Sequence, residues 1–204
     1  AAVASLQGDA ALALVRSGQR PTAAGTRRIV DGRLAALEWA PNPRAEIELG
    51  AVLLAMAGPL DGGSASSRRR LDGAAARLRA GLAQAPADAQ AWHLLASALL
   101  ALKRPDDATR ALRMSFRADP HTAQLSNART LLGVKLWDRS DHDLRASVLR
   151  EMQTLFRLDP VRGIRAALRT GSLPRLRAAL AHDPGDAQAL EIFLEEHHRA
   201  AASG

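Results

Sequence analysis

AAARLRAGLAQAPADAQAWHLLASALLALKRPDDATRALRMSFRADP, residues 74–120, contains one pattern of residues twice. The first copy recurs 34 residues later: Ala74, Leu78, Gly81 and Pro86 are followed by Ala108, Leu112, Ser115 and Pro120. Between the copies lies Trp92-x2-Leu95-Ala96-x2-Leu99. A period of this length, with small residues where helices meet and a proline closing each unit, indicates stacked helical hairpins. Because one hairpin cannot bury its apolar face alone, such hairpins stack and form a groove.

The composition of the whole chain agrees with a helical protein. Of its 204 residues 47% are hydrophobic, much of this alanine, while only 3% are aromatic. Abundant alanine favours helices and close helix contacts, and it argues against a β-sandwich. We therefore predict an all-α fold: a right-handed α-solenoid of about five hairpins, closed by a C-terminal capping helix.

Several classes of protein are excluded or disfavoured by simple counts. The sequence has no cysteine, which excludes disulfides, thiol nucleophiles and cysteine-ligated zinc. No apolar run approaches the ~18 residues of a membrane-spanning helix. The net charge is +7, and arginine supplies nearly all positive charge because only Lys103 and Lys135 are lysines.

The first residues, Ala1-Ala2-Val3-Ala4, lack an initiator methionine, and small residues of this kind often flank a processing site. Two expectations remain open: an exported, envelope-associated protein of a bacterium, or a trimmed cytoplasmic one.

Turn residues divide the expected single domain into parts. These are N-terminal helices (1–57), an inserted loop (58–70), the best-matching repeats (71–120), irregular repeats (121–184), and a terminal helix and tail (185–204). The loop is rich in Gly, Ser and Pro, and it either modifies a binding face or is simply a tolerated surface loop.

Helix boundaries are expected at recurring signals. Asp88 and Asp186 are placed to cap helix starts, and Pro41 and Pro43 to end a helix opened by Pro21. The other expected helices are Leu6–Arg16, Ala45–Ala57, Val161–Arg169, Leu173–Ala181 and Ala187–Ala200.

With Trp92-x2-Leu95-Ala96-x2-Leu99, Ala108-x3-Leu112 and Pro120, the chain resembles the tetratricopeptide repeat family. The full unit Ala89–Pro120 and the second half of the unit before it match in register. The resemblance implies a non-enzymatic scaffold or adaptor for other proteins, within a larger complex. It also implies that the first helix of each hairpin lines a concave groove.

That groove would receive a helix or an apolar segment of a protein partner. The implied groove residues are Gln90, His93, Ser97, Leu100 and Ala101 in one hairpin, and Ile47, Ala51 and Leu54 in the hairpin before it. Alternatively, the same residues pack against the chain's own neighbouring helices.

Arginines form a second candidate surface. Steps of three and four residues place Arg110, Arg113 and Arg117 on one helix face, and Arg162, Arg165 and Arg169 on another. Arg175 and Arg177 continue the second set. These side chains would suit an acidic polysaccharide, nucleic acid or an anionic membrane, although the stretch lacks the stacking aromatics typical of nucleic-acid surfaces. The alternative is a solvated outer face.

We predict neither catalysis nor a bound cofactor or metal. Neighbouring residues such as Asp141, His142 and Asp143 diverge by ~100° on a helix and do not converge on one ion. The H-E-x-x-H arrangement and the phosphate-binding Gly-Lys-Ser/Thr ending are both missing.

Overall fold

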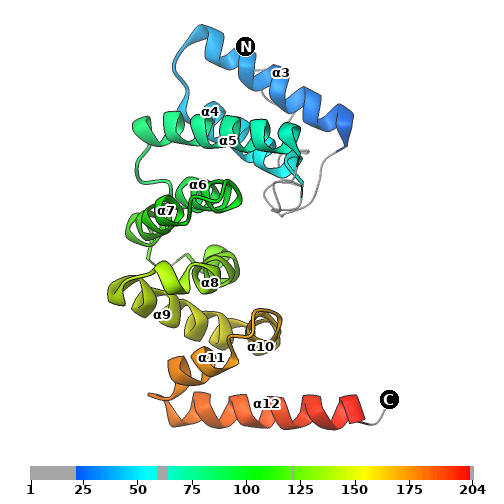
Figure 1. Cartoon of the computed structure of the whole chain (residues 1–204), viewed down its shortest axis with the longest axis vertical. Coiled ribbons are helices and arrows are strands. Elements are labelled where there is room, and N and C mark those ends of the chain that lie inside the picture. The colour runs from blue at the N-terminus through cyan, green and yellow to red at the C-terminus, as the bar shows by residue number, and fades with distance from the viewer. Residues whose placement is uncertain (1–21, 59–63, 121, 203–204) are drawn as a thin grey trace. The chain divides into compact units, whose positions relative to one another are not determined.

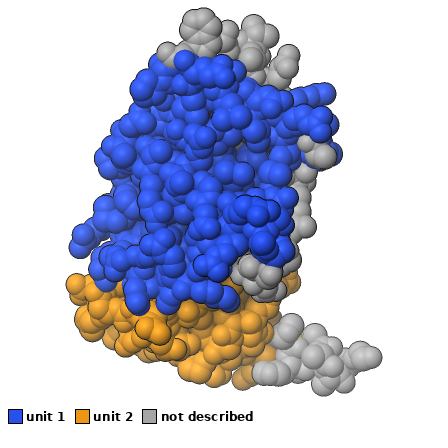
Figure 2. Space-filling view, turned by 45° about the horizontal axis from the view of Figure 1, so that its top comes forward, with its two compact units in different colours: residues 1–120 blue, residues 121–204 orange. Residues whose placement is uncertain are grey.

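The computed structural model describes residues 22–58, 64–120 and 122–202, and among these residues it contains helices but no strand. The all-α prediction is therefore confirmed (Figure 1). The chain packs as two compact units, residues 1–120 and 121–204, which Figure 2 distinguishes by colour. The boundary follows Pro120, the last residue of the repeat pattern in the sequence. The helix expected at Leu6–Arg16 lies outside the described residues.

The described helices of the first unit are α3 (Ala23–Trp39), α4 (Pro43–Met56), α5 (Ala65–Gln84), α6 (Ala89–Ala101) and α7 (Pro105–Ala118). α4 pairs with α5 and α6 with α7, so this unit contains two consecutive helical hairpins (Figure 1). α3 packs on α4, where Ile29 and Val52 form a small buried cluster. The 34-residue pattern of the sequence thus corresponds to α5 and α7, the second helices of the two hairpins.

Small residues set the distance between the helices of each hairpin. A Cβ atom on Gly50 would lie 2.6 Å from Leu78 Cγ, and one on Gly81 would lie 2.9 Å from the carbonyl oxygen of Pro43. In the next hairpin, Ser115 occupies the position of Gly81 and donates its hydroxyl to the carbonyl oxygen of Ala89 at 2.7 Å. Pro43 and Ala89 are each the first residue of a first helix. Both hairpins therefore bring a small residue of the second helix against the start of the first.

The loop expected at 58–70 is shorter in the structure. α5 begins at Ala65, because the side chain of Ser64 caps it by accepting a hydrogen bond from the Ser67 amide at 3.1 Å. The stretch 68–70 is therefore helical. The Ser67 hydroxyl also donates to the Ala57 carbonyl oxygen at 2.6 Å, which joins the end of α4 to the start of α5.

Two other boundary signals act differently from the prediction. Pro43 does not end α3 but opens α4, where its missing N–H costs nothing. Asp186 is not a helix cap, because α12 begins two residues earlier, at Pro184. Asp183 instead accepts hydrogen bonds from the Gly185 and Asp186 amides, at 2.9 and 3.3 Å.

Asp88 caps α6 as predicted, accepting a hydrogen bond from the Ala91 amide at 2.8 Å. We expect Asp88→Ala to lower the free energy of unfolding by about 1 kcal/mol, because one amide at the helix start loses its acceptor. Asp88→Asn, which keeps an acceptor oxygen, should retain most of that stability. Urea unfolding followed by circular dichroism would measure both variants. Equal midpoints for the Ala and Asn variants would contradict the capping role.

The second unit contains η1 (Ala123–Leu125), α8 (Ser126–Lys135), η2 (Trp137–Arg139), α9 (His142–Leu158), α10 (Pro160–Arg169), α11 (Leu173–Leu180) and α12 (Pro184–Ala202). α9 is central, because it contacts α8, α10 and α11. α10 and α11 both pack on α12 and lie on the same side of it (Figure 1).

Ion pairs of an arginine at the end of α9 link this helix to the start of α12. The Arg157 guanidinium donates to Asp183 Oδ2 and to Asp186 Oδ2, each at 2.7 Å. The hydrogen bond from the Asp186 amide is the main cause that lowers the pKa of Asp183, and the nearby Arg157 adds to this effect. On α12, Leu190 and Leu194 are buried against the unit, as expected for a terminal covering helix.

Candidate functional site

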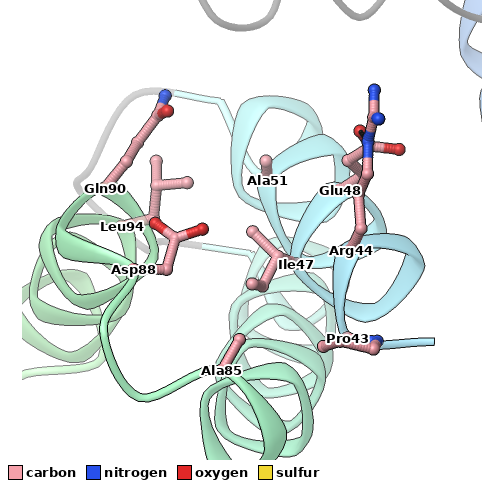
Figure 3. A pocket seen from close by; sticks show the side chains of 9 residues that line it. All are labelled: Pro43, Arg44, Ile47, Glu48, Ala51, Ala85, Asp88, Gln90 and Leu94. Atoms are coloured by element: carbon pink, nitrogen blue, oxygen red, sulfur yellow. Dashed lines mark hydrogen bonds and ion pairs between the residues drawn. The ribbon is translucent and has the colours of Figure 1, made fainter. Parts of the chain in front are cut away.

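A groove of about 320 Å³ lies between α4 and α6, the first helices of the two hairpins (Figure 3). It is lined by Pro43, Arg44, Ile47, Glu48, Ala51, Ala85, Asp88, Gln90 and Leu94. α4 supplies five of these residues, α6 supplies two, and Ala85 and Asp88 come from the connection between α5 and α6. The groove therefore exists because consecutive hairpins stack with their first helices side by side.

The lining of the groove is apolar at its centre and polar at its edges. Ile47 points from α4 into the groove, and Asp88, Gln90 and Leu94 lie along the opposite side (Figure 3). Ile47 and Leu94 are half-buried, whereas Gln90 is exposed. Such a lining suits one or two apolar side chains of a ligand, with polar groups available to its backbone.

A buried carboxylate supports the α4 side of the groove. Glu48 is only 3% exposed, and it accepts hydrogen bonds from the guanidinium groups of Arg33, on α3, and Arg44. The Arg44 Nε to Glu48 Oε1 distance is 2.8 Å. A buried carboxylate is tolerated when it is paired in this way. Both the ion pairs of Glu48 and the packing around it therefore hold the α4 side of the groove in place.

Of the groove residues that the family resemblance implies, some line the groove in the structure and others do not. Ile47, Ala51 and Gln90 line the groove. Ala101 does not, because it is buried in a core cluster with Ala57 and Leu71, against which Leu54 also packs. Ala101 therefore faces the core of the hairpins, and the half-buried Leu54 packs against the same cluster.

The other three implied residues lie on α6 outside the groove lining. The Ser97 hydroxyl donates to the carbonyl oxygen of His93 at 3.0 Å, within the same helix. His93, Ser97 and Leu100 are all half-buried.

Sequence reasoning missed six residues of the lining: Pro43, Arg44, Glu48, Ala85, Asp88 and Leu94. A signal was available for Leu94, because it follows Gln90 by four residues and so shares its helix face. No such signal existed for Glu48, whose burial depends on Arg33 from a different helix.

The arginines are spread over several environments. Arg110 pairs with Asp107, Arg162 with Asp159 at 3.3 Å, and Arg177 with Glu191 at 2.8 Å. The hydrogen bond from Arg177 is the main cause that lowers the pKa of Glu191. The carboxylate partners of these three arginines weaken their attraction for an external anion.

Arg175 contacts an aromatic ring instead. Its guanidinium carbon lies 4.9 Å from the ring centre of Trp137, and that of Arg145 lies 5.6 Å from the same centre. These cation–π contacts tie α9 and α11 to the short η2 helix. Arg117, Arg165 and Arg169 are exposed, whereas Arg113 is half-buried.

Within 22–58, 64–120 and 122–202, no cluster of His, Asp or Glu side chains is arranged to hold a metal ion. In the same ranges, no helix has both the length and the apolar character needed to cross a membrane.

Stacked helical hairpins with a groove along their first helices define a class of helical-repeat proteins that bind other proteins. A comparison with known families identifies which kind of helical repeat is present. Residues 66–132 match the model of the tetratricopeptide repeat family. This segment of the chain is therefore a tetratricopeptide-repeat segment, as its sequence pattern indicates. No curated protein matches the chain.

Proposed function

We propose that this protein is a non-enzymatic adaptor that holds a segment of a partner protein in the groove between α4 and α6. The single observation that carries the proposal is the groove itself, which has an apolar centre and lies where consecutive repeats bring their first helices together. Tetratricopeptide repeats serve as protein-interaction scaffolds, and the match at residues 66–132 covers α6 and most of α5.

The binding mechanism would be burial of apolar side chains. The partner segment would place one or two such side chains between Ile47 and Leu94, and it would be oriented by the polar groups of Gln90 and Asp88. A volume of about 320 Å³ is too small for a whole helix, so the partner would insert side chains and not its backbone. The paired Glu48 would hold the α4 wall in place before the partner arrives, which reduces the ordering cost of binding.

Site-specific photo-crosslinking in the native cells would test this proposal. A photo-reactive amino acid at Gln90, an exposed position on the edge of the groove, should capture a discrete protein. Leu94→Arg should reduce the yield of that product at least about tenfold, because a charged side chain then occupies the apolar centre.

The matched control uses Met56, which is 40% exposed at the far end of α4 and does not line the groove. The reactive group at Met56 should not capture the same protein, and Met56→Arg should leave the Gln90 product unchanged. Circular dichroism should show equal helicity for both Arg variants. A Gln90 product that is insensitive to Leu94→Arg, or the absence of any product, would refute binding in this groove.

A further inference from the structure

The two carboxylates that line the α4–α6 groove differ in how they are paired within the chain. Glu48 is buried and accepts hydrogen bonds from Arg33 and Arg44, so its charge is matched by the protein itself. Asp88 is different, because no basic side chain among the described residues pairs with its carboxylate. Asp88 therefore brings an uncompensated negative charge to the lining of the groove.

The carboxylate of Asp88 keeps one open oxygen although it caps α6. Its Oδ1 atom accepts the hydrogen bond from the Ala91 amide at 2.8 Å. An ionised carboxylate has about four acceptor positions on its two oxygens, so this single bond leaves Oδ2 available. Asp88 is half-buried and lies on the side of the groove opposite Ile47 (Figure 3). A ligand in the groove can therefore donate a hydrogen bond to Oδ2.

The surroundings of Asp88 favour a charged donor over a neutral one. Partial burial beside the apolar centre of the groove lowers the local dielectric constant, which strengthens the attraction between opposite charges. Arg44, the basic residue of the lining, lies on the α4 side and is paired with Glu48 (Figure 3). A cation on the α6 side of the groove would thus be next to Asp88 and across the groove from Arg44.

We propose that the groove selects a partner segment in which a lysine or arginine lies close to the inserted apolar side chain, and that this cation pairs with Asp88. The inference rests on the function proposed above and adds the charge of the partner to it. Ile47 and Leu94 would provide affinity through burial, whereas Asp88 would provide specificity. An acidic segment would be rejected, because it would place like charges together in a half-buried site.

Asp88→Asn tests the proposal because it separates the charge of this residue from its capping role. The amide oxygen of asparagine still accepts from the Ala91 amide, so α6 keeps its cap. The yield of the photo-crosslinked product from Gln90 should fall about tenfold, because a hydrogen bond between charged groups is lost. Asp72→Asn is the matched control, since Asp72 is exposed on α5 and does not line the groove. This variant has the same net charge and should give the wild-type yield.

The captured segment provides the second test. Mass spectrometry of the crosslinked product should locate a lysine or arginine within about one helical turn of the crosslinked position. A synthetic peptide of this sequence, and one with that basic residue replaced by glutamine, would be titrated against the whole chain by fluorescence anisotropy. The replacement should weaken binding about tenfold for the wild-type chain and hardly at all for Asp88→Asn, as a double-mutant cycle requires of a direct pair.

The possible failures of the two proposals are distinguishable. The charge preference is wrong if Asp88→Asn leaves the yield unchanged or raises it, if the captured segment has no basic residue nearby, or if the two substitutions act independently in the peptide titration. If Leu94→Arg still abolishes the product in any of these cases, binding in the groove stands without the charge preference. A product that is insensitive to both substitutions, or no product at all, would overturn both proposals.

Discussion

Leu112→Ala should lower the free energy of unfolding by about 2–5 kcal/mol, the range for removing a fully buried leucine side chain. Leu112 is 0% exposed and lies on α7, which packs on α6. Truncation removes the apolar contact and also leaves a cavity, because helices held by neighbouring hairpins cannot fully collapse around it. Urea unfolding followed by circular dichroism would measure the loss.

Leu34→Ala is the matched control for this experiment. Leu34 is 40% exposed on α3, so the same truncation should cost less than about 1 kcal/mol. If both variants lost a similar amount of unfolding free energy, this would contradict the role of Leu112 as a buried core residue.

Gly50→Ala should destabilise the protein by about 1–3 kcal/mol, although alanine is the better helix former. The added Cβ would lie 2.6 Å from Leu78 Cγ and 3.2 Å from the carbonyl oxygen of Ala74. Leu78 is fully buried, so it has no free space in which to move away. The two helices of the first hairpin must then separate, and a lower thermal midpoint would report this.

Gly73→Ala is the internal comparison for the same hairpin. Its added Cβ would meet only Leu53 Cδ1, at 3.4 Å, which is an ordinary contact. Because alanine loses less backbone entropy than glycine in a helix, we expect a gain of about 0.5–1 kcal/mol. The prediction is therefore a difference in sign between two glycine substitutions. Two losses, or two gains, would contradict the packing described for Gly50.

The repeat pattern predicted the fold because its residues are the ones that pack in the core between helices. Ala74, Leu78, Ala108 and Leu112 recur at one period since they occupy equivalent positions in two second helices, and all four are buried. The local capping signal at Asp88 was also informative, because Asp88 caps the start of α6 as its residue type favours.

Signals that depend on tertiary contacts were harder to interpret. Asp186 resembles Asp88 in its sequence context, but Asp183 takes the capping role, and Asp186 accepts from Arg157 instead. The groove was predicted only in part for the same reason. Helix periodicity indicates which residues share a face, as with Gln90 and Leu94, but not which faces of two helices meet. The pairing of Glu48 with Arg33 crosses 15 residues and leaves no periodic trace.

The two hairpins of the first unit differ in the number of residues between their first and second helices. Pro43 and Ala89 begin equivalent first helices and lie 46 residues apart, whereas the second helices repeat after 34. Part of the difference falls in the connection between α4 and α5, which is 57–64 against 102–104 in the next hairpin, and part lengthens the start of α5. Gly50 nevertheless packs closely against Ala74 and Leu78. The position of a second helix is thus determined by the surface it docks on and not by the length of chain that leads to it. This connection is consequently a natural acceptor for foreign sequence, such as an affinity tag or a reporter domain, that leaves the α4–α6 groove intact.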